Sequence, residues 1–230
     1  MKRTLTLLFF VTLLAASKSK LPVSTDKKPI PAKKEAVAQP ESLEKELKTY
    51  QDKLKNRIDL TVAFTQTTYK DLRKNTVKSQ GTASFHRPNQ FRWSTQKPVA
   101  QAEEWIFTGT ELFSHKNAIF TRYRVTGTIG KEIQQVVDMV INFDQLMKKY
   151  TLKQVTKEKD RVTILLLPLV ASDLQSATLQ LDTQKNFISQ VRLDFVGKNH
   201  TIFDFSAPDT RSLPAATFTI PKEAVVKEAL

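Results

Sequence analysis

The sequence predicts a mainly β protein with some helix, built on one large curved antiparallel sheet. Runs in which apolar and polar residues alternate recur between residues 60 and 206, and turn-forming residues separate many of them. Helical periodicity is confined to two stretches, 42–58 and 131–149. Sequential strands on short turns pair antiparallel, and alternation leaves one face of the sheet dry. We therefore expect the helices to pack on the concave side of the sheet.

The first residues indicate export. A basic start, an apolar run from Leu5 to Ala16 and small residues up to Ser17 are typical of a signal peptide, which we assign to residues 1–17. The apolar run is shorter than the roughly 20 residues that a membrane-spanning helix needs. The sequence contains no cysteine, so neither disulfides nor acylation at the cleavage site are expected. We expect an exported protein of a bacterial periplasm.

Residues 18–41 are rich in lysine and proline, contain no aromatic residue and show no apolar period, which predicts a disordered linker. The net charge of +13 adds attraction to anionic partners such as phospholipid surfaces. Two interpretations of the linker stay open, a solubilising tail or a basic tether on an anionic membrane. The remaining residues, 42–230, are expected to form one folded domain.

The first helical stretch begins at Ser42, a residue type suited to the N-cap. Its apolar residues recur at helical spacing on one face, which consists of Leu43, Leu47, Tyr50, Leu54 and Ile58. The second stretch carries an apolar face of Ile133, Val136, Val137, Val140, Ile141 and Phe143. Each helix must therefore cover apolar surface.

The strands follow from alternation and from the turns between them. We expect strands at 60–66, 82–86, 91–95, 104–108, 111–115, 118–125, 160–167, 177–182, 188–196 and 200–206. The large apolar residues that alternation places on the dry face are Phe64, Phe85, Phe91, Trp93, Trp105, Phe107, Val191, Leu193 and Phe195. They have two readings, a plain core beneath the helices or the lining of a cavity with a helical lid.

Catalytic chemistry is not indicated. The sequence has no nucleophile-elbow, phosphate-loop or zinc-protease motif. Its histidines, His86, His115 and His200, lie far apart, and Glu103 and Glu104 are adjacent on a strand and so point to opposite faces. We expect no enzyme activity, no metal site and no cofactor.

Nucleic-acid binding is the alternative that the charge suggests, since Arg87, Arg92, Arg122, Tyr123 and Arg124 combine basic and aromatic character. The export signal argues against it, and so does the alternation, which turns the aromatic rings away from the arginines. We expect no nucleic-acid partner.

Several motifs together resemble a known family. They are Phe64-Thr65-Gln66, Gly81 opening a strand that ends in Arg87-Pro88-Asn89, then Phe91-Arg92-Trp93, the hairpin 105–113 and a closing Phe218-Thr219-Ile220-Pro221. From about Leu43 to about Pro221 the chain is similar to the periplasmic carriers of outer-membrane lipoproteins, the LolA type. The resemblance implies a half-open β-barrel whose helices form a lid over a hydrophobic cavity.

The resemblance also implies a function without catalysis. Such carriers hold lipoprotein acyl chains, which they take from an inner-membrane ABC-type releasing complex and pass to an outer-membrane receptor. The family's arginine of the Arg-Pro-Asn motif holds the lid closed, a role that falls here on Arg87, while Phe91 and Trp93 would line the cavity. Thr108 departs from the family's usual aspartate before Gly109. We expect a monomer, and a carrier of other lipids or a lipoprotein-sensing regulator of the same fold remains the alternative.

Overall fold

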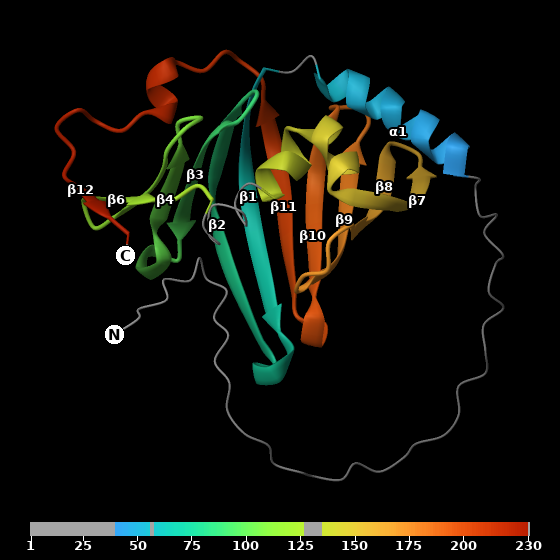
Figure 1. The fold of residues 1–230 in the computed structure, drawn as a ribbon, viewed down its shortest axis with the longest axis horizontal. Helices are drawn as coiled ribbons and strands as arrows, with labels where there is room; N and C mark the ends of the chain where they lie inside the picture. The colour runs from blue at the N-terminus through green and yellow to red at the C-terminus, as the bar shows by residue number, and fades with distance from the viewer. Residues whose placement is uncertain (1–39, 56–57, 127–134, 230) are drawn as a thin grey trace, which may run out of the picture. The chain divides into compact units, whose positions relative to one another are not determined.

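The computed structural model describes residues 40–55, 58–126 and 135–229. The signal peptide and residues 18–39 of the predicted linker lie outside these described residues. Between Pro40 and Leu230 the fold is one twelve-stranded sheet with few helices (Figure 1). The prediction of a single open, curved sheet is confirmed. Within the described ranges, no helix has the length and apolar character needed to cross a membrane.

The sheet follows the order β12, β6, β5, β4, β3, β2, β1, β11, β10, β9, β8, β7. Its first half consists of β1 (Asp59–Lys70), β2 (Asn75–His86), β3 (Gln90–Lys97), β4 (Glu103–Phe107), β5 (Leu112–Lys116) and β6 (Ile119–Tyr123). Its second half consists of β7 (Tyr150–Glu158), β8 (Arg161–Pro168), β9 (Leu174–Asp182), β10 (Phe187–Phe195), β11 (His200–Asp209) and β12 (Val226–Glu228). All pairs are antiparallel except β12 with β6, which is parallel.

The first helix, α1 (Pro40–Lys55), begins two residues before the expected Ser42 and ends before Ile58. Tyr50 and Leu54 are buried as predicted. The prediction for Ile58 is wrong, because its side chain is 61% exposed. Helix α1 ends at Lys55 and β1 begins at Asp59. Ile58 therefore lies outside the helix whose four-residue spacing predicted its burial.

The second helical stretch is interrupted within the described residues. Residues 135–140 are α-helical and are followed by the 3-10 helix η3 (Phe143–Lys148), while 131–134 lie outside the described part of the chain. Val137, Val140 and Ile141 are buried, which confirms the predicted apolar face for these positions. Figure 1 shows this segment lying across β10 and β11.

Three strand segments were not predicted from the sequence. They are β7, the first half of β2 from Asn75 to Gln80, and the short β12. The first two expose many polar residues on both faces, and their burial alternates weakly or not at all. Backbone pairing at a sheet edge and in a long hairpin holds these segments in the sheet without a dry face.

The two faces of the sheet are covered by different parts of the chain. Register pairs Leu60 with Phe85, Phe85 with Phe91 and Phe91 with Phe107, so these side chains share what we call the inner face. Inner-face residues Leu60 and Phe187 meet Leu54 of α1 and helical Val140 around one small cleft. The helices therefore roof the inner face.

The outer face of β3 to β6 is covered by residues 213–228, which we call the C-terminal strap. Ile220 and Ala224 of the strap pack on an outer-face cluster of Ile106, Phe113 and Phe120. The strap includes the 3-10 helix η5 (Ala215–Phe218), in which Phe218 is 1% exposed. The motif Phe218-Thr219-Ile220-Pro221 thus belongs to the side of the sheet opposite the roof.

Polar contacts hold the strap on the sheet. Arg92 donates to both carboxylate oxygens of Glu104 at 2.7 Å and, through Nη1, to the carbonyl of Thr217 at 3.0 Å. The buried Asp59 accepts from the backbone N–H of Leu213 at 3.3 Å. A bidentate arginine–carboxylate pair that also binds a carbonyl fixes orientation as well as position.

Gly81 lies in the interior of β2 rather than at its start, at a bulge where Gln80 pairs with Lys97 but Gly81 pairs with Thr95. A Cβ at this position would lie 1.8 Å from the carbonyl oxygen of Ser94 and 2.9 Å from the ring of Phe64. Only glycine allows β3 to approach this closely.

We expect Gly81→Ala to destabilise the fold by about 1–3 kcal/mol, because the added methyl group must displace the backbone of β3. Chemical denaturation followed by tryptophan fluorescence measures this. Thr82→Ala, at the exposed neighbouring position, is the matched control and should change the free energy of unfolding by no more than about 0.5 kcal/mol. Equal midpoints for the two variants would contradict the argument.

Candidate functional site

The register places the predicted cavity residues on the inner face except Phe195, which pairs with Leu174 beyond a register shift at the end of β10. Trp93 pairs with Trp105 and Phe91 with Phe107 across β3 and β4. Val191 of β10 pairs with Phe203 of β11. The predicted residues that are buried are Phe64, Phe85, Phe91, Trp105, Phe107, Val191 and Leu193, while Trp93 and Phe195 are half-buried.

Trp93 is the centre of an aromatic cluster. Its ring centroid lies 4.3 Å from that of Phe64 and 6.5 Å from that of Phe85. It also meets the edges of Phe203 at 5.5 Å and Phe205 at 6.1 Å. Edge-to-face contacts at these distances add to the energy of burial. The half-buried indole thus joins strands from both halves of the sheet.

Phe203 and Phe205 were missed as candidate site residues. They lie on β11 and are 6% and 5% exposed. The sequence contained the signal, because the segment 200–206 alternates and the two rings are two residues apart. Only the register, which pairs Phe205 with Phe64, shows that β11 adjoins β1 and completes the cluster.

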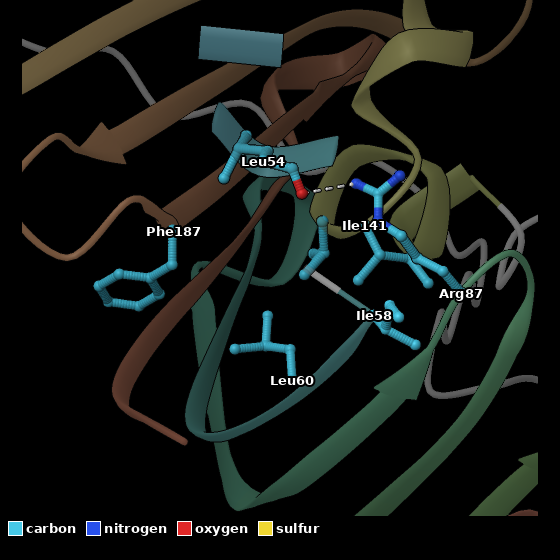
Figure 2. Close-up of a pocket in the computed structure, with 7 residues that line it drawn as sticks. Leu54, Ile58, Leu60, Arg87, Ile141 and Phe187 are labelled. Atoms are coloured by element: carbon cyan, nitrogen blue, oxygen red, sulfur yellow. Dashed lines mark hydrogen bonds between the residues drawn. The ribbon is translucent and has the colours of Figure 1, made fainter. Parts of the chain in front are cut away.

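The roof closes tightly on the inner face at one end of β1. A cleft there is lined by Leu54, Ile58, Leu60, Arg87, Val140, Ile141 and Phe187 (Figure 2). It offers about 10 Å³, which is about the space of one water molecule. This space is too small for an acyl chain.

Arg87 lies at the rim of this cleft and binds the roof. Its guanidinium Nη2 donates to the carbonyl oxygen of Leu54 at 3.3 Å (Figure 2). Leu54 is in the last turn of α1, where carbonyls have no partner within the helix and the helix dipole favours a cation. The backbone N–H of Arg87 also donates to the carbonyl of Ile58 at 2.9 Å. The β2–β3 turn therefore holds the end of α1 through one residue.

The second helical segment is held from β7. Gln135 donates to the hydroxyl of Tyr150 at 2.6 Å, and Lys149 forms an ion pair with the buried Asp138. Burial raises the pKa of the Tyr150 phenol, and the hydrogen bond from Gln135 partly opposes that shift. Contacts of α1 with β7 and with η3 complete the roof.

The far rim of the inner face is polar. Burial raises the pKa of the Glu103 carboxyl, against the opposing effects of Lys116 and of a hydrogen bond from Trp105. Tyr123 lies against Trp105 with a centroid distance of 5.1 Å, and burial raises the pKa of its phenol. A carboxyl and a phenol here give the apolar face a hydrogen-bonding border.

The histidines do not meet. His86 bonds to Asp59 at 2.7 Å, His115 stacks on Phe120 and His200 stacks on Tyr69. Within the described residues, no group of three or more potential metal ligands comes together.

The family model described as outer membrane lipoprotein carrier protein LolA matches residues 57–221. The chain belongs to the LolA family. A comparison with curated proteins found no match.

The chain is similar to several solved structures, of which one superposes with a TM-score above 0.5. An uncharacterised conserved protein from Thermus thermophilus superposes with a TM-score of 0.52 at 10% identity, over 82% of this chain and 99% of that chain. A LolA-superfamily protein from Nitrosomonas europaea gives 0.42 at 13% identity, over 76% and 97%. The lipoprotein LppX of Mycobacterium tuberculosis gives 0.46 at 12% identity, over 77% and 100%. At these identities the likeness is one of fold alone.

One departure from the LolA pattern has a structural explanation. Thr108, which stands where the family usually has aspartate, accepts the backbone N–H of Glu111 at 3.1 Å through its hydroxyl. An aspartate carboxylate would accept the same bond, so threonine keeps the turn. Gln90 donates to the carbonyl of Thr108 and Asn89 to that of Gly109, which joins this turn to the one that carries Arg87.

We expect Arg87→Met to loosen the last turn of α1, because it removes the donor to Leu54 while keeping an apolar side chain of similar length. A lost hydrogen bond of this kind is worth about 0.5–1.5 kcal/mol, which corresponds to an increase in amide exchange of about 2- to 10-fold in that turn. Hydrogen–deuterium exchange with mass spectrometry measures it, and peptides from β9 and β10 serve as the internal control. Unchanged exchange in residues 50–55 would contradict the assignment.

Proposed function

We propose that the protein is a periplasmic carrier that binds lipoprotein acyl chains between the sheet and its roof and shuttles lipoproteins from the inner to the outer membrane. The inner face is the observation that carries the proposal. In a member of the LolA family, it presents a continuous aromatic surface roofed by helices, and the polar contacts that hold this roof include the bond from Arg87 to Leu54.

Binding requires the roof to move. Since the closed cleft holds about 10 Å³, acyl chains gain access only when the roof lifts from the inner face. Each CH₂ group removed from water contributes about 0.8 kcal/mol, so a 16-carbon chain gains roughly 12 kcal/mol. Part of this energy is used to separate the roof from Leu60 and its neighbours. That cost keeps the bound cargo releasable.

Arg87 acts as the latch in this proposal. A hydrogen bond that exists in the closed state alone favours that state and lowers the apparent affinity for acyl chains. The expected partners follow from the family, namely an inner-membrane ABC-type releasing complex as donor and, where one exists, an outer-membrane receptor as acceptor. The mechanism needs no cofactor and no enzyme activity.

The first test is native mass spectrometry of the protein purified from its periplasm, followed by identification of bound lipids. A complex with one acylated lipoprotein would support the carrier. A bound phospholipid or glycolipid would keep the cavity and change the cargo. A protein without lipid that also fails to bind a synthetic triacylated lipopeptide would overturn the proposal, and the same peptide without acyl chains is the control ligand.

We expect Arg87→Leu to bind the triacylated lipopeptide more tightly and to release it more slowly, by up to about tenfold, because the closed state loses one hydrogen bond. Titration and competition with a fluorescent lipopeptide measure both effects. Arg192→Leu is the matched control, since Arg192 lies in β10 and pairs with Asp194 rather than with the roof. If uptake and release in Arg87→Leu equal those of the control, Arg87 is not a latch.

A further inference from the structure

Three loops at one end of the sheet expose apolar side chains. The 3-10 turn η1 (Asp71–Arg73) joins β1 to β2, the turn η4 (Val196–Lys198) joins β10 to β11, and residues 169–173 join β8 to β9. The exposed fractions of their apolar side chains are 68% for Leu72, 54% for Val196, 56% for Leu169 and 77% for Val170. Side chains of this size exposed together mark an interaction surface.

The loops form one surface, which we call the tip surface. The backbone N–H of Asp71 in η1 donates to the side chain of Asn199, next to η4, at 3.0 Å. The N–H of Val196 donates to the carbonyl of Asp173 in the third loop at 2.9 Å. Figure 1 shows the β1–β2 and β10–β11 turns side by side where these strands end.

Cations surround the apolar side chains of the tip surface. Lys70, Arg73 and Lys74 flank Leu72, and Lys198 follows Val196. Within η1 and η4 the carboxylate is that of Asp71, which forms an ion pair with Lys74 at 2.7 Å. Burial and the neighbouring charge of Arg73 both lower the pKa of Lys70, as expected where positive charges crowd together. The third loop adds the exposed carboxylate of Asp173, so around the apolar side chains four cations stand against two carboxylates and the surface is positive on balance.

We propose that the tip surface docks on a bilayer that contains anionic phospholipid, with Leu72, Val196 and Val170 entering the headgroup region and the cations contacting lipid phosphates. Apolar side chains on projecting turns beside lysine and arginine suit an interface in which a polar, anionic layer covers an apolar one. A specific protein partner binds at a contiguous, closely packed patch of surface. The tip surface consists of separate projections instead.

The surface is independent of the latch. Asp59 pairs with His86 at one end of the β1–β2 hairpin and Lys70 with Asn75 at the other, so Arg87 lies about 37 Å from the tips at 3.4 Å per residue. The inference goes beyond the proposed carrier function, because it concerns the membrane on which the protein acts and needs no bound cargo.

Sedimentation of the full chain with phospholipid vesicles tests the charges. The double variant Arg73→Gln, Lys198→Asn should bind vesicles of phosphatidylglycerol and phosphatidylcholine about 30-fold more weakly than the parent, since each cation near such a surface contributes about 1 kcal/mol. Asparagine suits the left-handed conformation of Lys198, whose φ is 61°, so the turn should persist. Lys222→Gln, Lys227→Gln is the control with the same loss of charge at exposed strap positions. Binding in the control should stay close to that of the parent.

The apolar contribution is tested by Leu72→Ser, Val196→Ser against Val225→Ser, which alters a side chain that is 67% exposed on the strap. The first variant should also bind anionic vesicles about tenfold more weakly, and the second should bind as the parent does. Equal losses in tip and strap variants, or none in either, would overturn the proposal. A membrane protein captured by the tip surface without any tip-dependent vesicle binding would overturn it as well, and would assign the surface to a protein partner.

Uptake of the triacylated lipopeptide by the same tip variants separates the two proposals. Parent-like uptake shows that the variants are folded and that a loss of vesicle binding belongs to the tip surface. Failure of the parent itself to bind the lipopeptide would count against the carrier function and would leave the vesicle comparison intact.

Discussion

The structure depends on covering an apolar inner face that a single curved sheet cannot bury by itself. Aromatic side chains from β1, β3 and β11 meet around Trp93. Exposure of their apolar surface to water would be unfavourable. The roof of α1 and the segment 135–148 covers this face around Leu60 and Phe187. Its polar ties include Arg87 to Leu54, Gln135 to Tyr150 and Lys149 to Asp138. A cover that apolar contact holds in place can be replaced by another apolar occupant, since the hydrophobic effect does not distinguish a leucine from an acyl chain.

The outer face has a fixed cover, in contrast to the replaceable cover of the inner face. The strap is tied by the bidentate Arg92–Glu104 pair, by Asp59 and by parallel pairing of β12 with β6, and it buries Phe218 almost completely. Directional bonds of this kind fix one arrangement, whereas apolar contact permits several. Close approach of β3 to β2 at Gly81 adds to the rigidity of the sheet itself. The sheet is thereby stiffened from outside, and a movement of the roof need not distort the strands that carry the aromatic cluster.

The sequence predicts the parts of this fold in which a local pattern coincides with burial. Residues 91–93 of β3 and 191–193 of β10 alternate, and the register places their large apolar side chains on one side. The prediction fails where stabilisation comes from elsewhere in the chain. β7 and the first half of β2 expose polar residues on both faces and are held by backbone pairing. Ile58 fits the helical spacing of the sequence, but helix α1 ends at Lys55 and the side chain of Ile58 is exposed. Phe203 and Phe205 show the same limit for the site, because β11 follows β10 in the chain but pairs with β1 as well. Non-local register cannot be read from spacing.

The long β1–β2 hairpin connects the end of the sheet that carries Arg87 with the end that carries the tip surface. At one end the turn after β2 carries Arg87, which touches the roof, and at the other η1 carries Leu72 between cations. An exchange of acyl chains between a membrane and a carrier needs the protein near the lipid surface and also needs a roof that is free to lift. Contact through the tips would satisfy the first need without touching α1, because the hairpin spans the height of the sheet. Electrostatic contact of this kind weakens as ionic strength rises and as the anionic lipid content of the surface falls, whereas burial of acyl chains does not. The electrostatic part of docking would thus have no counterpart in loading, and a membrane poor in anionic lipid could be left without the cargo being given up.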